Sequence, residues 1–112
     1  MEIQRQIRDD VTVLYFAGDL DIYAMPSFHE EFRECMDANT NNIIVNLQQV
    51  SALYSSGVGA LISYSQQLKK QNRRMLLAAP SHTVMHVLQL MKLQDFFEIF
   101  SSEKDAEQSA IH

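Results

Sequence analysis

The run Ile43-Ile44-Val45-Asn46-Leu47 is apolar at nearly every position and rich in β-branched residues. A strand that is apolar on both faces must be covered on both faces, which is typical of the centre of a parallel sheet. Helical and strand patterns then alternate, with a helical stretch over 58–68, a short buried strand at 75–79, a helical stretch after Ser81 and an edge-like strand at 97–100. This alternation predicts an α/β fold with a parallel core.

The first part of the chain predicts an antiparallel hairpin at the start of that sheet. Ile3 to Ile7 alternates weakly, Asp9-Asp10 is typical of a turn, and Val11 to Phe16 is rich in β-branched and aromatic residues. Gly18-Asp19-Leu20-Asp21 has the residue types that end a strand in a turn.

Pro26 is expected at the first position of the next helix, where its missing N–H costs nothing. The apolar stripe of this helix consists of Phe28, Phe32, Cys35 and Met36. A short helix is also expected to begin at Ser101-Ser102-Glu103. The prediction is therefore one domain, residues 1–112, with a mixed, mostly parallel sheet of about five strands and about four helices.

Charge and hydropathy exclude several classes of protein. The net charge of −5 and a pI of about 5.2 argue against a nucleic-acid binder. We find no apolar run near the ~20 residues of a membrane span and no signal-peptide pattern, and a single cysteine fits a reducing cytoplasm. Acids concentrate in residues 1–37 and bases in 69–74, so either opposed patches orient a protein partner or the bases simply form a solvated, cationic helix end.

The stretch Leu53-Tyr54-Ser55-Ser56-Gly57-Val58-Gly59 stands between the central strand and the following helix. Serine is a good N-cap, and each glycine costs a helix about 1 kcal/mol relative to alanine. Two glycines in one turn suggest that this helix start meets something at close range. The alternative is that the serines only cap the helix and the glycines only serve packing. We expect Gly57 and Gly59 to contact a partner and to be dispensable for folding.

The sequence matches no catalytic or metal-binding motif. His82 and His86 are spaced i, i+4, but neither His29 nor His112 is near in sequence to complete a ligand set. Cys35 lacks the setting that activates a nucleophile, and Ser55 is not in a Gly-x-Ser-x-Gly elbow. No phosphate-binding loop occurs. We expect no enzyme activity, no metal and no cofactor.

The order hairpin, Gly18-Asp19-Leu20-Asp21, helix, apolar strand, Ser55-Ser56-Gly57-Val58-Gly59 and helix resembles the STAS domain family over essentially the whole chain. It resembles most the stand-alone bacterial members, which are anti-sigma factor antagonists of the cytoplasm. The resemblance implies that Ser55 is phosphorylated by a partner that is both an anti-sigma factor and a GHKL-type serine kinase. It also implies that the unphosphorylated form binds this partner, and that a PP2C-type phosphatase resets the switch.

The resemblance further implies a partner-binding surface, and its residues are Asp19, Asp21, Tyr54, Ser55, Ser56, Gly57 and Gly59. Tyr54 departs from the family pattern, which commonly has Asp before the modified serine. This departure implies either altered recognition by the kinase or a site that is not used. Ser56 is a second, weaker candidate for phosphorylation. Asp19 and Asp21 match an acidic turn of the family, although turn formation alone would also explain them.

Two other functions fit the same residues. One is a STAS module that binds a protein without being phosphorylated, in a signalling or transport assembly. The other is a module that holds a nucleotide or lipid phosphate at the helix start near Gly57 and Gly59.

Overall fold

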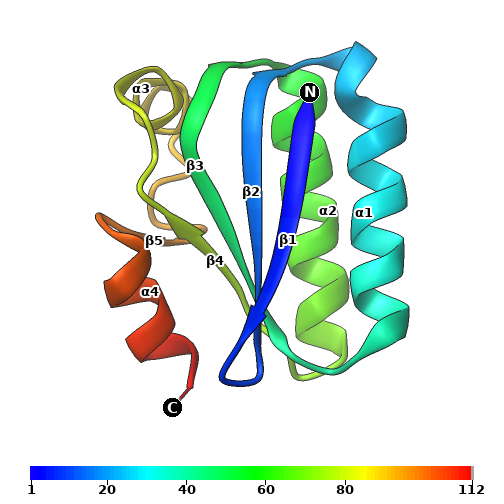
Figure 1. The fold of residues 1–112 in the computed structure, drawn as a ribbon. Coiled ribbons are helices and arrows are strands. Elements are labelled where there is room, and N and C mark those ends of the chain that lie inside the picture. Colours follow the sequence, from blue (N-terminus) through cyan, green and yellow to red (C-terminus); the bar gives the residue numbers. More distant parts are fainter. Residues whose placement is uncertain (112) are drawn as a thin grey trace.

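The computed structural model describes residues 1–111 and has one sheet flanked by helices (Figure 1). The strands are β1 (Glu2–Arg8), β2 (Val11–Leu20), β3 (Asn42–Leu53), β4 (Met75–Ala78) and β5 (Glu98–Phe100). The helices are the 3-10 helix η1 (Ile22–Ala24) and the α-helices α1 (Met25–Ala38), α2 (Ser55–Lys70), α3 (His82–Leu90) and α4 (Glu103–Ala110).

The sheet has the strand order β1-β2-β3-β4-β5. β1 and β2 are antiparallel, and each later neighbour pair is parallel. The hairpin turn is Asp9-Asp10, and both residues have positive φ (49° and 64°), as the tight turns that match strand twist require. The mixed, mostly parallel five-stranded sheet with an N-terminal hairpin and four α-helices is confirmed.

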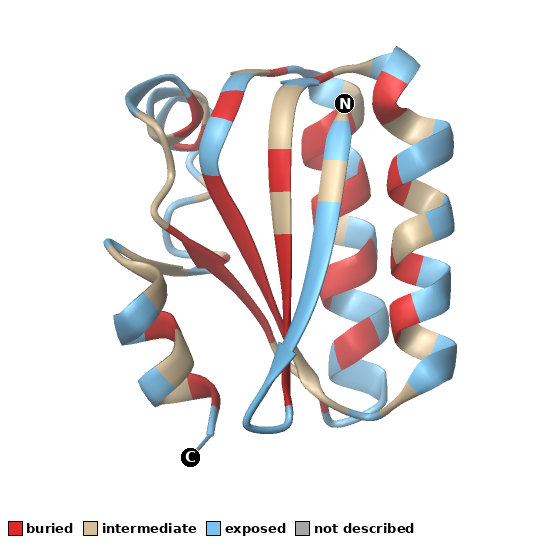
Figure 2. Cartoon of the chain, in the orientation of Figure 1, coloured by how far each residue is buried: buried red, intermediate tan, exposed pale blue. Residues whose placement is uncertain are grey.

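The strand order decides where the helices lie. Parallel strands that follow one another across a sheet are joined by right-handed crossovers, and these bring every connecting helix to the same face. Accordingly, α1, α2 and α3 share one core with one face of the strands. The short helix α4 covers the other face, where Ala106 and Ala110 lie over Val13, Ile44 and Leu76. Figure 2 shows the central strands buried between these layers.

The larger core is built on the apolar stripe expected for α1. Phe28, Phe32 and Cys35 are fully buried. The ring of Phe32 stacks on that of Tyr64 from α2, with centroids 4.7 Å apart, while His29 Nδ1 lies 2.8 Å from the Tyr64 hydroxyl. These contacts fix α2 beside α1, which positions the start of α2.

Three element boundaries differ from expectation. The stretch Gly18-Asp19-Leu20 is not a turn that follows the strand but the last part of β2, because Leu20 pairs with Leu53 in β3. β3 accordingly extends well past Leu47. The following helix begins at Ser55 rather than near Val58. Tertiary pairing across the sheet lengthens both strands beyond their apolar runs.

The basic cluster at 69–74 is only partly a solvated surface. Arg73 is 2% exposed. Its guanidinium donates to the carbonyl oxygens of Cys35 (3.2 Å) and Asn41 (2.8 Å). A cation at the C-terminal end of α1 complements the helix dipole and satisfies carbonyls that the helix leaves unpaired. Arg74 pairs with Glu98, so both arginines hold the fold together.

Candidate functional site at the start of helix α2

The candidate site lies at the carboxyl ends of β2 and β3, the upper edge of the sheet in Figure 1. Asp19 pairs in register with Ala52, and Leu20 with Leu53. The Tyr54 amide then donates to the Leu20 carbonyl at 3.1 Å. This pairing brings the Gly-x-Leu-Asp stretch and the Ser-Ser-Gly stretch to the same edge, although more than thirty residues separate them in sequence.

Ser55 is exposed and is the first residue of α2, and Ser56 is half-buried beside it. The expected cap is not formed. Tyr54 occupies the N-cap position in an extended conformation, and no side chain among residues 1–111 caps the helix. A serine inside the first turn has helical backbone angles, so its hydroxyl is not placed over the free amides as that of an N-cap residue is. The Ser55 hydroxyl is therefore not engaged in holding the helix start.

Gly57 has a structural role, which corrects the expectation that it is dispensable for folding. It is buried, and a Cβ placed on it would lie 2.7 Å from both Cγ and the carbonyl oxygen of Leu20. The same Cβ would lie 3.1 Å from Leu53 Cδ1. Such distances are shorter than carbon contacts allow, so glycine is required for α2 to pack against the end of β2.

Gly59 is different, because it is exposed and a Cβ placed on it would meet no atom within 4 Å. Its conformation is helical and needs no glycine. The sequence predicted the same role for both glycines. Only Gly59, one turn after Ser55, exposes helix backbone that no side chain covers.

The two acids of the Gly-x-Leu-Asp stretch have different roles. Asp21 N-caps η1, since its Oδ1 accepts a hydrogen bond from the Ala24 amide at 3.1 Å. Turn formation is thus a role that the structure gives it. Asp19 is exposed near the end of β2 and adds a negative charge to the site.

Sequence reasoning missed an exposed apolar group next to these acids. Ile22 and Tyr23, both in η1, are 66% and 87% exposed, whereas Tyr54, which the sequence analysis did assign to the site, is 53% exposed. The available signal was the apolar pair Ile22-Tyr23 between Asp21 and Pro26. The pair does not continue the apolar stripe of the following helix, so that stripe gives it no buried position.

The two stretches that form the site contain no basic side chain. Residues 18–25 and 53–59 include Asp19 and Asp21 but no Lys, Arg or His, and the chain has no charged residue at all from 38 to 68. The exposed side of α2 is consequently uncharged over its first three turns. Interface centres are depleted in charge and enriched in tyrosine.

Titratable groups with shifted pKa values lie away from this edge. Burial and the hydrogen bond to Glu103 raise the pKa of Tyr15 to about 12, and burial raises the pKa of the Cys35 thiol. Among residues 1–111, no cluster of three or more His, Cys, Asp or Glu side chains is arranged to hold a metal ion. His82 and His86 are both exposed on α3. The chemistry available at the site is that of an exposed serine hydroxyl beside exposed tyrosine and isoleucine side chains.

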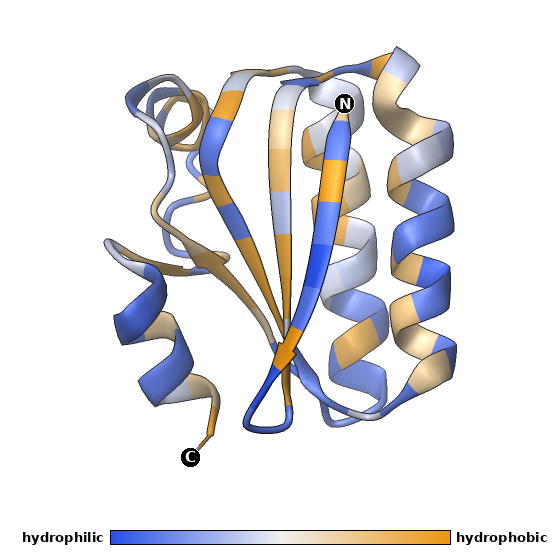
Figure 3. Ribbon diagram, viewed as in Figure 1, coloured by the Kyte–Doolittle hydropathy of each residue, from blue (hydrophilic) through white to orange (hydrophobic). Residues whose placement is uncertain are grey.

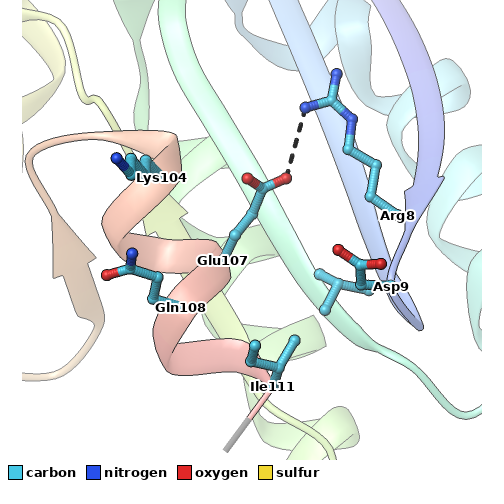
Figure 4. A pocket seen from close by; sticks show the side chains of 7 residues that line it. Arg8, Asp9, Lys104, Glu107, Gln108 and Ile111 are labelled. Atoms are coloured by element: carbon cyan, nitrogen blue, oxygen red, sulfur yellow. Dashed lines mark ion pairs between the residues drawn. The ribbon is translucent and has the colours of Figure 1, made fainter.

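One cavity lies near the opposite end of the sheet, between the hairpin turn and α4 (Figure 4). Glu107 extends from α4 toward Arg8 there, with 3.6 Å between the paired atoms. This cavity is not continuous with the start of α2, so it does not extend the candidate site. No helix in residues 1–111 combines the length and hydropathy that crossing a membrane requires.

Comparison with known proteins places this geometry in a family. The sequence model of the family described as STAS domain matches residues 2–106. The anti-sigma-B factor antagonist of Staphylococcus aureus (strain NCTC 8325 / PS 47) is 22% identical over 99 residues, which cover 88% of this chain and 92% of that protein.

Solved structures show the same fold. An anti-sigma factor antagonist from Mycobacterium paratuberculosis superposes with a TM-score of 0.88 at 19% identity, covering 99% of this chain and 94% of that one. The anti-sigma factor antagonist SpoIIAA in its unphosphorylated form gives 0.81 at 24% identity, with 96% and 95% covered. The phosphorylated form of the Bacillus protein SpoIIAA gives 0.73 at 23% identity, with 96% and 98% covered. Because the family model matches nearly the whole chain, this protein belongs to the STAS domain family.

Proposed function

We propose that this protein is a bacterial anti-sigma factor antagonist that acts in the cytoplasm and is switched by phosphorylation of Ser55. The unphosphorylated form binds an anti-sigma factor that is also a GHKL-type serine kinase, and a PP2C-type phosphatase reverses the modification. The protein itself is a regulator and catalyses no reaction. The observation that carries the proposal is the exposed Ser55, which does not cap the helix, beside segments 18–25 and 53–59 that contain no Lys, Arg or His.

The proposed chemistry is a transfer of the γ-phosphoryl group of ATP. Ser55 Oγ forms a bond to the γ-phosphorus and loses its proton, while the bond from that phosphorus to the bridging oxygen of ADP breaks. The product carries about −1.5 to −2 additional charges. The first-turn amides and the helix dipole accommodate an anion at this position, so α2 is expected to stay folded.

The effect on binding follows from the charge around Ser55. The site offers no Lys or Arg to neutralise a phosphate, and Asp19 already contributes a negative charge. The added charge is therefore presented outward to whatever covers α2. A partner fitted to the small Ser55 side chain and the bare Gly59 would meet both bulk and charge, so its affinity would fall.

Ser56 is the weaker of the two candidate hydroxyls, because it is less exposed than Ser55. Tyr54 is half-exposed directly before Ser55 and is proposed to influence how the kinase recognises the site.

A second candidate is a STAS module that binds a partner constitutively. The observation that favours it is Tyr54 itself, since an aromatic residue supplies apolar contact area where an acid would supply charge. In this alternative the same surface binds, but Ser55 is not modified.

The decisive experiment measures the affinity of Ser55→Ala and Ser55→Asp for the anti-sigma factor kinase encoded in the same genome. Ser55→Ala is expected to bind like the parent and to accept no phosphate at position 55. Ser55→Asp is expected to fold normally and to bind at least tenfold more weakly. Ser101→Asp, an exposed serine after β5, is the matched control for added charge and should bind like the parent.

One outcome would overturn the switch, and another would assign it to a different residue. If the kinase leaves the parent protein unlabelled at Ser55 and Ser55→Asp binds as tightly as the parent, the constitutive module is the better description. If labelling falls on Ser56, established by peptide mass analysis, the switch survives but the residue is wrong.

A further inference from the structure

The element η1 exposes apolar side chains that the fold does not use. Ile22 and Tyr23 are 66% and 87% exposed, whereas Ala24 is the one residue of η1 that is buried. Large apolar side chains grouped on a surface mark sites of interaction with other proteins. Ile22 and Tyr23 are therefore available for contact with another molecule.

This pair is also held in a fixed position. The Ala24 amide donates to both the Asp21 carbonyl and Asp21 Oδ1, each at 3.1 Å. Just before η1, Leu20 is fully buried and lies against Gly57. The two anchored ends leave η1 little freedom, so little side-chain and backbone entropy is lost when Ile22 and Tyr23 are covered.

The position of the pair identifies its occupant. η1 packs against both α1 and α2 at the edge where α2 begins, and the Tyr54 amide is bonded to Leu20, two residues before Ile22. A molecule that binds over Ser55 and Gly59 therefore lies next to η1. The uncharged start of α2 continues the surface without interruption by a base.

We infer that Ile22 and Tyr23 form an apolar anchor that inserts into a recess on the anti-sigma factor, with Asp21 as the residue that positions it. The inference rests on the proposed function, since it names how the partner is held. Ser55 then controls whether the two surfaces close, while the anchor supplies the affinity. Tyrosine at the centre of an interface commonly carries much of the binding energy.

The test is the affinity of Ile22→Ala, Tyr23→Ala and the double variant for the purified anti-sigma factor kinase. Each single variant is expected to weaken binding about tenfold, and the double variant about thirtyfold or more. Ile7→Ala is the matched control, because Ile7 is 61% exposed but lies at the hairpin end of β1, away from the site. It should bind like the parent. Melting temperatures of all variants should agree within error, since the side chains are exposed.

The outcomes separate the anchor from the proposed function. If the parent protein binds and is labelled at Ser55 while the double variant keeps parental affinity, the anchor is wrong and the switch stands. If the parent neither binds the kinase nor is labelled, the proposed function fails and the anchor with it. Asp21→Asn, which retains a capping oxygen, should bind more tightly than Asp21→Ala, and equal loss in both would show that the carboxylate charge, not the cap, matters.

Discussion

The two glycines of the Ser-Ser-Gly-x-Gly stretch differ in what surrounds them, although the sequence shows them as a pair. Gly57 faces the carbonyl of Leu20, and Gly59 faces open space. Sequence patterns placed a serine-rich helix start after the central strand, although the helix begins at Ser55 rather than near Val58 and no serine caps it. The close approach of Leu20 arises from pairing between β2 and β3. The same applies to Tyr54, whose N-cap position depends on how far β3 extends.

We predict that Gly57→Ala destabilises the protein by about 1–3 kcal/mol through overpacking against Leu20. Gly59→Ala should be neutral or stabilise by up to about 1 kcal/mol, because its helical position is open. Urea unfolding of both variants provides the comparison, each serving as the other's control. Equal free energies of unfolding for the two variants would contradict the packing role of Gly57.

We predict that Tyr15 lowers the free energy of unfolding at high pH. Its pKa is raised from 10.0 to about 12 by burial and by the Glu103 carboxylate, so the folded state favours the neutral phenol. The stabilisation is complete below pH 10 and is lost as the pH rises from 10 to 12. In Tyr15→Phe the free energy of unfolding should fall less steeply over this range, and the highest tyrosinate transition in ultraviolet absorbance should be absent. An unchanged absorbance titration would show that another tyrosine is responsible.

At the scale of elements, α4 is attached differently from the other helices. It contributes two buried alanines to the smaller core, and Figure 3 shows it as mostly hydrophilic. Polar contacts supply much of its attachment: Glu103 accepts from the Tyr15 hydroxyl (2.9 Å), Asn46 Nδ2 (3.0 Å) and Arg8 Nη1 (3.2 Å). Ser102, as expected for a helix start near 101–103, caps this helix.

We predict that Glu103→Ala loosens α4, because it leaves Asn46 and Tyr15 without their acceptor. The loss should be about 1–3 kcal/mol, and amide hydrogen exchange should rise in α4 before it rises in β3. Glu107→Ala is the control, since that carboxylate has a single longer ion-pair contact of 3.6 Å with Arg8. Equal exchange in both variants would mean that Glu103 is not the main attachment.

Elements were predictable where the signal is local. The hairpin turn, the α1 stripe and the helix that begins directly after Ser81 were all confirmed. η1 was not anticipated, since a three-residue helix has no periodicity to detect and depends on a single acid, Asp21.

At the scale of the whole molecule, Arg73 joins parts of the chain that the sequence keeps apart. It reaches from the loop after α2 to the end of α1 and to Asn41 before β3. The order of strands and helices could be predicted because alternation and handedness leave few topologies. The burial of one arginine within a basic cluster could not, because charge patterning alone describes Arg73 and Lys70 alike.

We predict that Arg73→Ala lowers the free energy of unfolding by about 2–4 kcal/mol, since buried carbonyls lose their donor. Lys70→Ala, which removes an exposed charge nearby, should stay within about 0.5 kcal/mol. The slope of free energy against urea should be unchanged in both, because the whole domain unfolds together. A second transition in the Arg73→Ala curve would contradict this cooperative role.

The two described ends of the chain lie at opposite edges of the sheet, and this matters for anyone attaching a label. The Met1 backbone lies against Gly18, where a Cβ on that glycine would be 3.6 Å from Met1 Cα, so it neighbours the edge that carries Asp19. The far end of α4 is tied to the start of β3, where Asn42 Nδ2 donates to the Ala110 carbonyl. A fluorophore, affinity tag or surface linker joined after α4 leaves the edge with Ser55 free, whereas one joined before Met1 would crowd it.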